Sequence, residues 1–248
     1  DYQNMTGFDA LTMGIAEMTA GYRVVDGKPS MTADGAGSYI FRLYLKDSGN
    51  YRWANEVDSV TLSWTVTKAV YDMSAVKFDK EEYAYAYNGL LQYPTYSGTL
   101  PKGMDGIAVA AQYSGGATHV SDGRQSVTVT FSTASPNYVF KNGTASTTIT
   151  AYVVITPFEI ENVRWTEQKN FTFNGEDQSS SVVAEYEAVD GRWIALALEK
   201  VDFTNYREEG YTFIVAGFAA ADDHGDYALG AAEGASQIYY IDKMHVTV

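Results

Sequence analysis

The chain has 248 residues, of which 46% are hydrophobic, and it carries 17 basic and 31 acidic side chains for a net charge of −14. This acidic balance argues against nucleic-acid binding, since phosphate recognition needs a concentrated basic face, and against anionic membrane surfaces. The chain has no cysteine, which excludes disulfides, thiolate zinc sites and cysteine nucleophiles. No apolar run reaches the roughly 18–20 residues of a spanning helix, so we expect no membrane insertion.

The composition favours an all-β fold. The chain contains 20 Tyr, 11 Phe and 4 Trp but only 5 Pro, and aromatic and β-branched side chains suit the half-buried faces of sheets. The one helical candidate, residues 8–18, is short and contains Gly14. Alternating apolar and polar residues predict strands, in chain order, over residues 37–45, 60–67, 126–131, 146–155, 182–189, 192–198, 210–216 and 237–241.

Asp-Gly pairs indicate tight turns between these strands, because glycine readily adopts the positive φ that two-residue hairpins require. The strongest hairpin prediction joins 182–189 to 192–198 through Asp190-Gly191. The other Asp-Gly pairs are Asp26-Gly27, Asp105-Gly106 and Asp122-Gly123.

Two sequence blocks recur at a nearly constant spacing. The first is an Asn-Tyr or Asp-Tyr pair after an alternating strand, and its tyrosines, Tyr51, Tyr138 and Tyr227, are 87 and 89 residues apart. The second is aromatic-x-aromatic-Asn-Gly, which ends at Gly89 and again, 86 residues later, at Gly175. Repeats of this length predict an array of domains of immunoglobulin-like (Ig-like) size.

The repeats place three domains along the chain. We expect them at residues 1–68, where the opening strand is missing, at 69–156 and at 157–248. Residues 242–248 would open a next unit or form a last edge strand. The joins at 67–69 and 155–157 contain no Gly/Ser tract, so we expect neighbouring domains of the polypeptide to touch and to form a stiff, extended array.

The order of these motifs resembles the tandem Ig-like repeats of large cell-surface proteins of Gram-positive bacteria. The resemblance rests on the aromatic-x-aromatic-Asn-Gly block, the Ser-Gly-Thr-Leu-Pro-Lys-Gly segment at 97–103, the Asn-Tyr pair, and the closing strand at 62–66, which runs into Tyr71-Asp72-Met73. It covers nearly the whole chain. The third unit departs from it, because it lacks the Gly-Thr-Leu-Pro segment and has a longer hairpin.

This resemblance implies small antiparallel β-sandwiches, an extracellular location on the bacterial cell surface or cell wall, and a stalk or adhesion role without catalytic residues. It also implies that the chain is a piece of a larger exported protein. A β-grasp-like repeat is the structural alternative, because each unit contains nearer five or six strands than seven.

No catalytic constellation is evident. His119, His224 and His245 lie far apart in the sequence, and no Gly-x-Ser-x-Gly motif occurs. Gly35-Ala36-Gly37 lacks the third glycine of a dinucleotide fingerprint. The oxygen-rich segment 222–226 could suggest calcium but lacks the EF-hand pattern. We therefore predict a protein that is not an enzyme, with no cofactor and no metal site.

Aromatic residues supply the candidate binding residues. Trp53, Trp64 and Trp165 are predicted to pack inside the domains, since Trp53 aligns with Phe140 and Leu229. Trp193 follows the Asp190-Gly191 turn and is the best candidate for an exposed ring, with Tyr186 and Tyr206 as further contacts. The Asn before Tyr51 and Tyr138 is predicted to fix a local turn.

The expected function is that of a non-enzymatic stalk or adhesion segment. One alternative is a carbohydrate- or matrix-binding module, with a host glycan or matrix protein as its partner. Another is an accessory β region of a secreted polysaccharide-degrading enzyme. A Lys–Asn isopeptide bond is a further possibility, for which Lys68, Lys77 and Lys141 lie in or near predicted strands.

Overall fold

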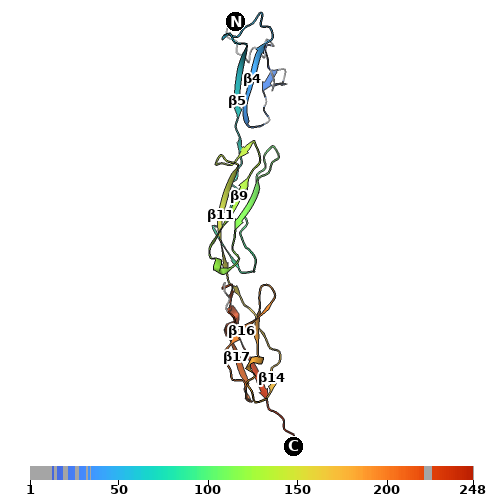
Figure 1. The fold of residues 1–248 in the computed structure, drawn as a ribbon, viewed down its shortest axis with the longest axis vertical. Coiled ribbons are helices and arrows are strands. Elements are labelled where there is room, and N and C mark those ends of the chain that lie inside the picture. The colour runs from blue at the N-terminus through green and yellow to red at the C-terminus, as the bar shows by residue number, and fades with distance from the viewer. Residues whose placement is uncertain are drawn as a thin grey trace. The chain divides into compact units, whose positions relative to one another are not determined.

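The structure is a computed structural model that describes residues 13, 16–18, 22–25, 28–31, 33, 35–220 and 225–247. These residues form β-strands arranged in several sheets, joined by turns and by short 3₁₀ helices (Figure 1). The all-β prediction is therefore confirmed, and the arrangement in several sheets is consistent with a β-sandwich. None of the described segments is a helix with the length and apolar character needed to cross a membrane.

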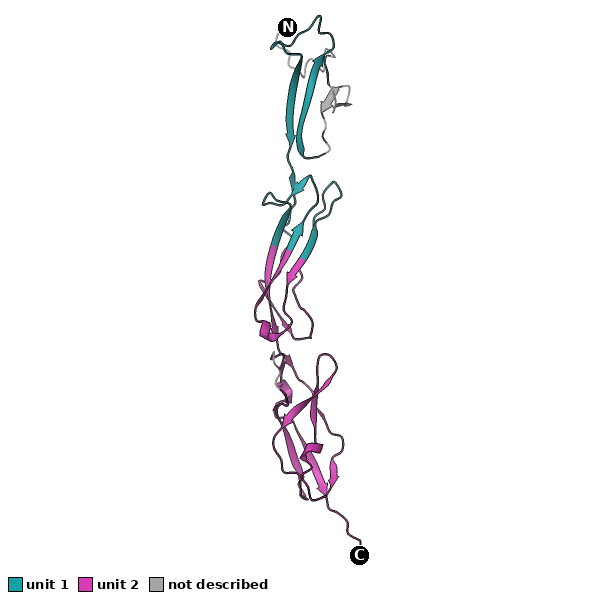
Figure 2. Cartoon of the chain, in the orientation of Figure 1, with its two compact units in different colours: residues 1–76, 98–112, 130–148 teal, residues 77–97, 113–129, 149–248 magenta. Residues whose placement is uncertain are grey.

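The chain divides into two compact units (Figure 2). Unit 1 contains residues 1–76, 98–112 and 130–148, and unit 2 contains residues 77–97, 113–129 and 149–248. Three strands contribute residues to both units: β8 (Ala110–Gly115), β9 (Gln125–Ser132) and β11 (Ser146–Thr156). The predicted division into domains at 1–68, 69–156 and 157–248 stays a prediction.

Unit 1 contains a three-stranded antiparallel sheet in the order β1-β4-β5. Its strands are β1 (Ala16–Met18), β4 (Gly37–Leu45) and β5 (Ser59–Val66). Phe41 and Leu43 of β4 are buried, whereas Ile40 and Arg42, which alternate with them, are exposed, as the sequence pattern predicted. With Ala16 and Trp53 they form a small core. Trp64 of β5 packs against this core, so Trp53 and Trp64 have the packing roles expected of them.

A two-stranded antiparallel sheet also lies in unit 1, formed by β2 (Tyr22–Val25) and β3 (Lys28–Met31). The predicted Asp26-Gly27 turn lies outside the described residues. So does most of the helical candidate at 8–18, of which the described residues 16–18 form β1.

Short parallel strand pairs occur in both units with the same backbone pattern. In unit 1, β6 (Ala69–Val70) pairs with β10 (Tyr138–Val139), and the N–H of Ala69 donates to the carbonyl of Asn137 at 2.8 Å. In unit 2, β12 (Phe158–Glu159) pairs with β18 (Tyr227–Ala228), and the N–H of Phe158 donates to the carbonyl of Asp226 at 2.8 Å. Both partners of the second bond lie 89 residues after those of the first.

A four-stranded sheet has the order β7-β11-β9-β8, in which β7 (Glu82–Ala86) runs parallel to β11. Val127 of β9 and Val153 of β11 are fully buried, because alternate residues of each strand point to the core. These two valines belong to one hydrophobic cluster. Tyr85, Tyr87 and Tyr113 pack against this cluster and are only partly buried.

The largest sheet lies in unit 2 and has six strands in the order β13-β15-β16-β17-β19-β14. The strands are β13 (Arg164–Trp165), β14 (Asn170–Thr172), β15 (Ala184–Glu187), β16 (Trp193–Leu198), β17 (Tyr211–Phe218) and β19 (Ser236–Asp242). The β16–β17 register shifts between Ala197 and Leu198. Figure 1 marks β16, β17 and β14 of this sheet.

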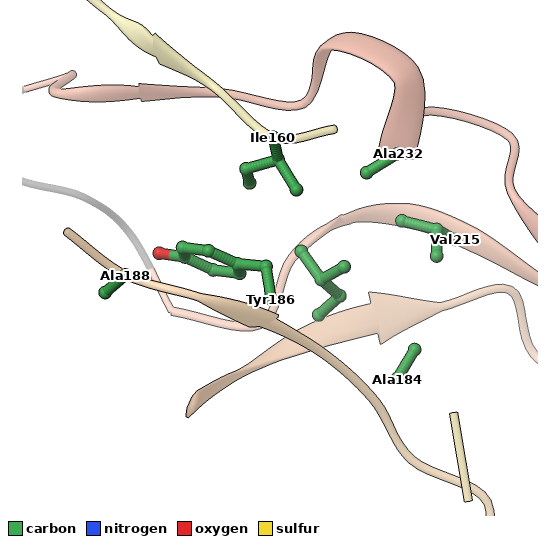
Figure 3. Packing of buried hydrophobic residues seen from close by; sticks show 7 residues of the cluster. Ile160, Ala184, Tyr186, Ala188, Val215 and Ala232 are labelled. Atoms are coloured by element: carbon green, nitrogen blue, oxygen red, sulfur yellow. The ribbon is translucent and has the colours of Figure 1, made fainter. Parts of the chain in front are cut away.

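Two hydrophobic clusters stabilise this part of unit 2. One contains Tyr186, Ile160 and Val215 with small alanines around them, and Figure 3 shows these side chains converging. The other is built on Phe203, Phe213 and Tyr239, all nearly fully buried, whose rings meet edge to face. Trp165 packs against both clusters, as a packing role predicts.

The turns follow the predicted chemistry where they are described. Gly191 has a φ of 82° and closes the β15–β16 hairpin, whose paired strands are shorter than predicted. Three 3₁₀ helices are described: η2 (Val120–Asp122), η3 (Ser179–Ser181) and η4 (Gly230–Ala232). After β19, residues 243–247 carry no strand, so the described part of the tail does not form the predicted edge strand.

Candidate functional site

Trp193 is the candidate binding residue that the structure places at the surface. It opens β16 opposite Glu187 of β15 and is 40% exposed. The guanidinium of Arg164 lies 3.8 Å from the centre of the Trp193 ring, so one face of the indole carries a cation–π contact. Arg164 is held there by Glu185, whose Oε2 accepts hydrogen bonds from Nε at 3.1 Å and from a terminal nitrogen at 2.5 Å.

A groove of about 710 Å³ lies beside this ring in unit 2. Its lining residues include Trp193, Asn162 and three glutamates, Glu159, Glu161 and Glu187. An aromatic ring beside several hydrogen-bond acceptors suits a ligand that has both an apolar face and hydroxyl or amine donors. Since Arg164 covers one face of the indole, such a ligand would use the uncovered face or the edge.

Tyr186 is not at the surface. It is 3% exposed and lies among the buried residues of the core (Figure 3). Its ring packs against Phe218 and Tyr227. The expectation that Tyr186 contacts a ligand therefore needs correction, because adjacent strand residues point to opposite faces and Tyr186 is on the buried one with Ala184 and Ala188.

Tyr206 is 46% exposed, but it is not among the residues that line the Trp193 groove. The ammonium of Lys243 lies 4.3 Å from the centre of its ring. The structure therefore separates the three residues that the sequence grouped: Trp193 lies in the groove, Tyr206 on another surface and Tyr186 in the core.

Asp226 forms a contact that sequence reasoning missed. Its side chain is 3% exposed, and its Oδ2 lies 2.6 Å from Nδ1 of His119. Its Oδ1 accepts the backbone N–H of Val120 at 2.8 Å. A buried carboxylate is stable only when it is hydrogen-bonded or paired with a cation. Here Val120 and His119, which precede Asp226 by 106 and 107 positions, supply the two contacts.

An aromatic cluster surrounds this contact in unit 2. The His119 ring stacks on Tyr87 at 5.9 Å, and Tyr87 meets Tyr227 edge to face at 5.4 Å. Tyr227 in turn contacts Phe158 and Tyr186. His119 is therefore a packed and partnered residue whose side chain is 32% exposed.

Asn137 in unit 1 also makes a contact of long sequence separation. Its Oδ1 accepts the backbone N–H of Ala36 at 2.8 Å, across 101 residues. Its Nδ2 donates to Oδ2 of Asp105 at 3.4 Å, and Ser135 donates to the same oxygen at 2.5 Å. The Ser135 hydrogen bond is the main cause that lowers the pKa of Asp105 below its usual range, with smaller contributions from Ile107 and Asn137.

These contacts correct the prediction that the Asn before Tyr138 fixes a local turn. The side-chain oxygen of Asn137 reaches a distant segment. The prediction holds for Asn50, whose Nδ2 donates to Oδ2 of the nearby Asp47 at 2.6 Å, while its backbone N–H donates to Oδ1 of the same carboxylate.

The remaining candidates offer little chemistry. Asp222, Asp223 and His224 of the suggested calcium segment lie outside the described residues, and within the described ranges no three His, Asp or Glu side chains are grouped as metal ligands. His245 is exposed. Lys68, Lys77 and Lys141 are exposed as well, whereas an isopeptide bond needs a lysine in a dry core.

Comparison with known proteins finds no matching family model and no curated protein to which the chain is similar.

Proposed function

We propose that the chain is a non-enzymatic stalk or adhesion segment of an exported bacterial cell-surface protein, built from three Ig-like β-sandwich domains in an extended array. The observation that carries this proposal is the equivalent pair of backbone contacts next to the two predicted joins. At one, Ala69 and Tyr71 donate to Asn137 and Val139, and at the other, Phe158 and Ile160 donate to Asp226 and Ala228.

A repeated contact of this kind supports a mechanical role. Directly after each predicted join, the chain enters a parallel strand pair of the following domain, so no free linker lies between the join and that domain. The side chain of Asn137 or Asp226 adds a bond to a segment of the preceding domain. Bending at a join would break these side-chain bonds, so the array should resist bending.

Small-angle X-ray scattering of the whole chain tests the array. A compact globule of 248 residues would have a radius of gyration of about 18 Å. The proposal predicts a value well above this and a pair-distance distribution with a long tail. A radius close to about 18 Å would contradict the extended array.

A second candidate function is carbohydrate binding at the Trp193 groove. It is favoured by one specific observation, namely that the half-exposed Trp193 lies in a groove whose lining residues include three glutamates and an asparagine.

A glycan array with the purified chain tests this second function. Saturable binding should be lost in Trp193→Ala and kept in Tyr206→Ala, the matched control, because Tyr206 is an exposed aromatic residue outside the groove. Both variants should melt like the parent. Absence of binding by a folded parent chain would contradict the candidate.

A further inference from the structure

Asn137 and Asp226 occupy the same position in the repeated motif and make the same kind of contact. Each directly precedes a motif tyrosine, and each side chain accepts a backbone N–H at 2.8 Å from a segment more than 100 residues earlier. The donor is Ala36, immediately before β4, in one case and Val120, shortly before β9, in the other. We refer to these two interactions as the Asn137 latch and the Asp226 latch.

The surroundings of the two latches differ in charge. Next to Asn137 lies the carboxylate of Asp105, to which the amide donates, and the N–H donor on the facing segment is that of Ala36, beside Gly35. Next to Asp226 lies the imidazole of His119, which pairs with the carboxylate when it is protonated. At the Asn137 latch, a neutral amide therefore lies beside the negative charge of Asp105. At the Asp226 latch, a carboxylate lies beside the basic imidazole of His119.

Steric fit distinguishes the two latches as well. A Cβ added to Gly35 would lie 2.6 Å from Oδ1 of Asn137, so the Asn137 latch needs a residue without a side chain on the facing segment. At the Asp226 latch the facing residue is His119, whose side chain is itself part of the contact. The two facing segments are therefore not interchangeable.

We infer that the residue before the motif tyrosine determines which domain end can dock in front of it. An amide at this position, as in Asn137, selects a domain end that presents Gly-Ala, because the carboxylate of Asp105 already lies beside the amide. A carboxylate at this position, as in Asp226, selects a domain end that presents a histidine and a backbone N–H. This inference rests on the proposed division into consecutive domains. The partner of each latch is the end of another Ig-like repeat with the matching chemistry, and charge and size together determine which neighbouring end each latch can hold.

Exchanging the two residues should weaken each latch for a different reason. In Asn137→Asp, the new carboxylate replaces the amide that donates to Asp105, so two negative groups face each other. In Asp226→Asn, the oxygen that accepts from Val120 can remain, but the charge that pairs with protonated His119 is lost. Each exchange should act on its own join and leave the other unchanged.

Distances between spin labels test this directly, since the chain has no cysteine and two introduced thiols would be the only ones. One labelled parent carries Ser63→Cys and Thr148→Cys, and the other carries Thr148→Cys and Thr212→Cys. All three positions are exposed. Double electron–electron resonance then measures the width of the distance distribution across each predicted join in the whole chain.

We expect Asn137→Asp to broaden only the 63–148 distribution and Asp226→Asn to broaden only the 148–212 distribution. Adding Asp105→Asn to Asn137→Asp should narrow the first distribution again, because it removes the facing charge. Asn50→Asp is the matched control, since Asn50 has the same motif position but only a local partner, and it should broaden neither distribution.

Narrow distributions in both exchange variants would overturn the latch inference and leave the array intact. Broadening of both distances by a single exchange, with a lower melting temperature, would also overturn it, because the residue would then support the fold and not one join. Broad distributions in both labelled parents would instead contradict the proposed stiff array.

Discussion

The Asn137 and Asp226 contacts share a backbone geometry but differ in burial. Asn137 is half-buried and its Oδ1 accepts one backbone N–H, while Asp226 is 2% exposed and its carboxylate meets both a backbone N–H and an imidazole. The same fold position thus tolerates a neutral amide and a carboxylate, provided that each has its own partners. Because buried charge is costly without partners, the Asp226 contact should be the more sensitive of the two.

The largest effect is expected for Asp226→Ala. This substitution removes the acceptor of the Val120 N–H and the partner of His119 from a buried site. We expect a loss of about 2–3 kcal/mol in the free energy of unfolding, measured by urea denaturation. If Asp226→Ala lowers the free energy of unfolding no more than Asn50→Ala does, burial does not make the Asp226 contact more important for stability than the exposed Asn50 contact.

Gly35→Ala should destabilise the Asn137 contact by a smaller amount. The new methyl group would lie 2.6 Å from Oδ1 of Asn137, so the amide must move and its hydrogen bond to Ala36 would weaken. The expected cost is about 1 kcal/mol. Gly37→Ala is the matched control, because its added Cβ would meet nothing closer than 3.7 Å. Equal effects of the two substitutions would contradict this explanation.

The contribution of Asp105 should depend on pH. Its pKa is held below the ordinary 3.8, mainly by the Ser135 hydroxyl, so the folded state favours the ionised carboxylate. The resulting stabilisation is present above the pKa of the unfolded chain and is lost as the pH falls through the lower, folded pKa. NMR titration should show the pKa of Asp105 rising towards 3.8 in Ser135→Ala. An unchanged pKa would exclude the hydroxyl as the main cause.

The smallest effect is expected for Asn50→Ala. Asn50 and Asp47 are both exposed, and the hydrogen bond between them is local. We expect the melting temperature to remain that of the parent, while the pKa of Asp47 rises because it loses its main stabilising contact, the Asn50 side chain. A marked drop in melting temperature would mean that Asn50 has a role beyond its own turn.

Strands were predictable because their pattern is local. Alternation alone placed β4 at Gly37–Leu45, and the Asp190-Gly191 pair identified the β15–β16 hairpin. The same reasoning applied to residues 182, 184, 186 and 188 would have placed Tyr186 on the buried face, since all four are buried. Its burial was therefore accessible from the sequence through alternation.

The candidate site was less predictable because its contacts join distant segments. The Asn-Tyr repeat marked Asn137 as notable, but nothing in the sequence indicates that its partner is Ala36, 101 residues away. The Asp226 contact with His119 was hidden for the same reason. Exposure of Trp193 was predictable from its place after a turn, whereas the Arg164 guanidinium over its ring was not.

The central claim is that the chain consists of consecutive, separately folded domains, and pulling the whole chain from its two ends in a force spectrometer tests it most directly. The account predicts three successive unfolding events. Each should release about 24–33 nm of contour length, the span of 68 to 92 residues at about 3.6 Å per residue. A single event that releases the entire chain would contradict the account, because it would show one cooperative fold.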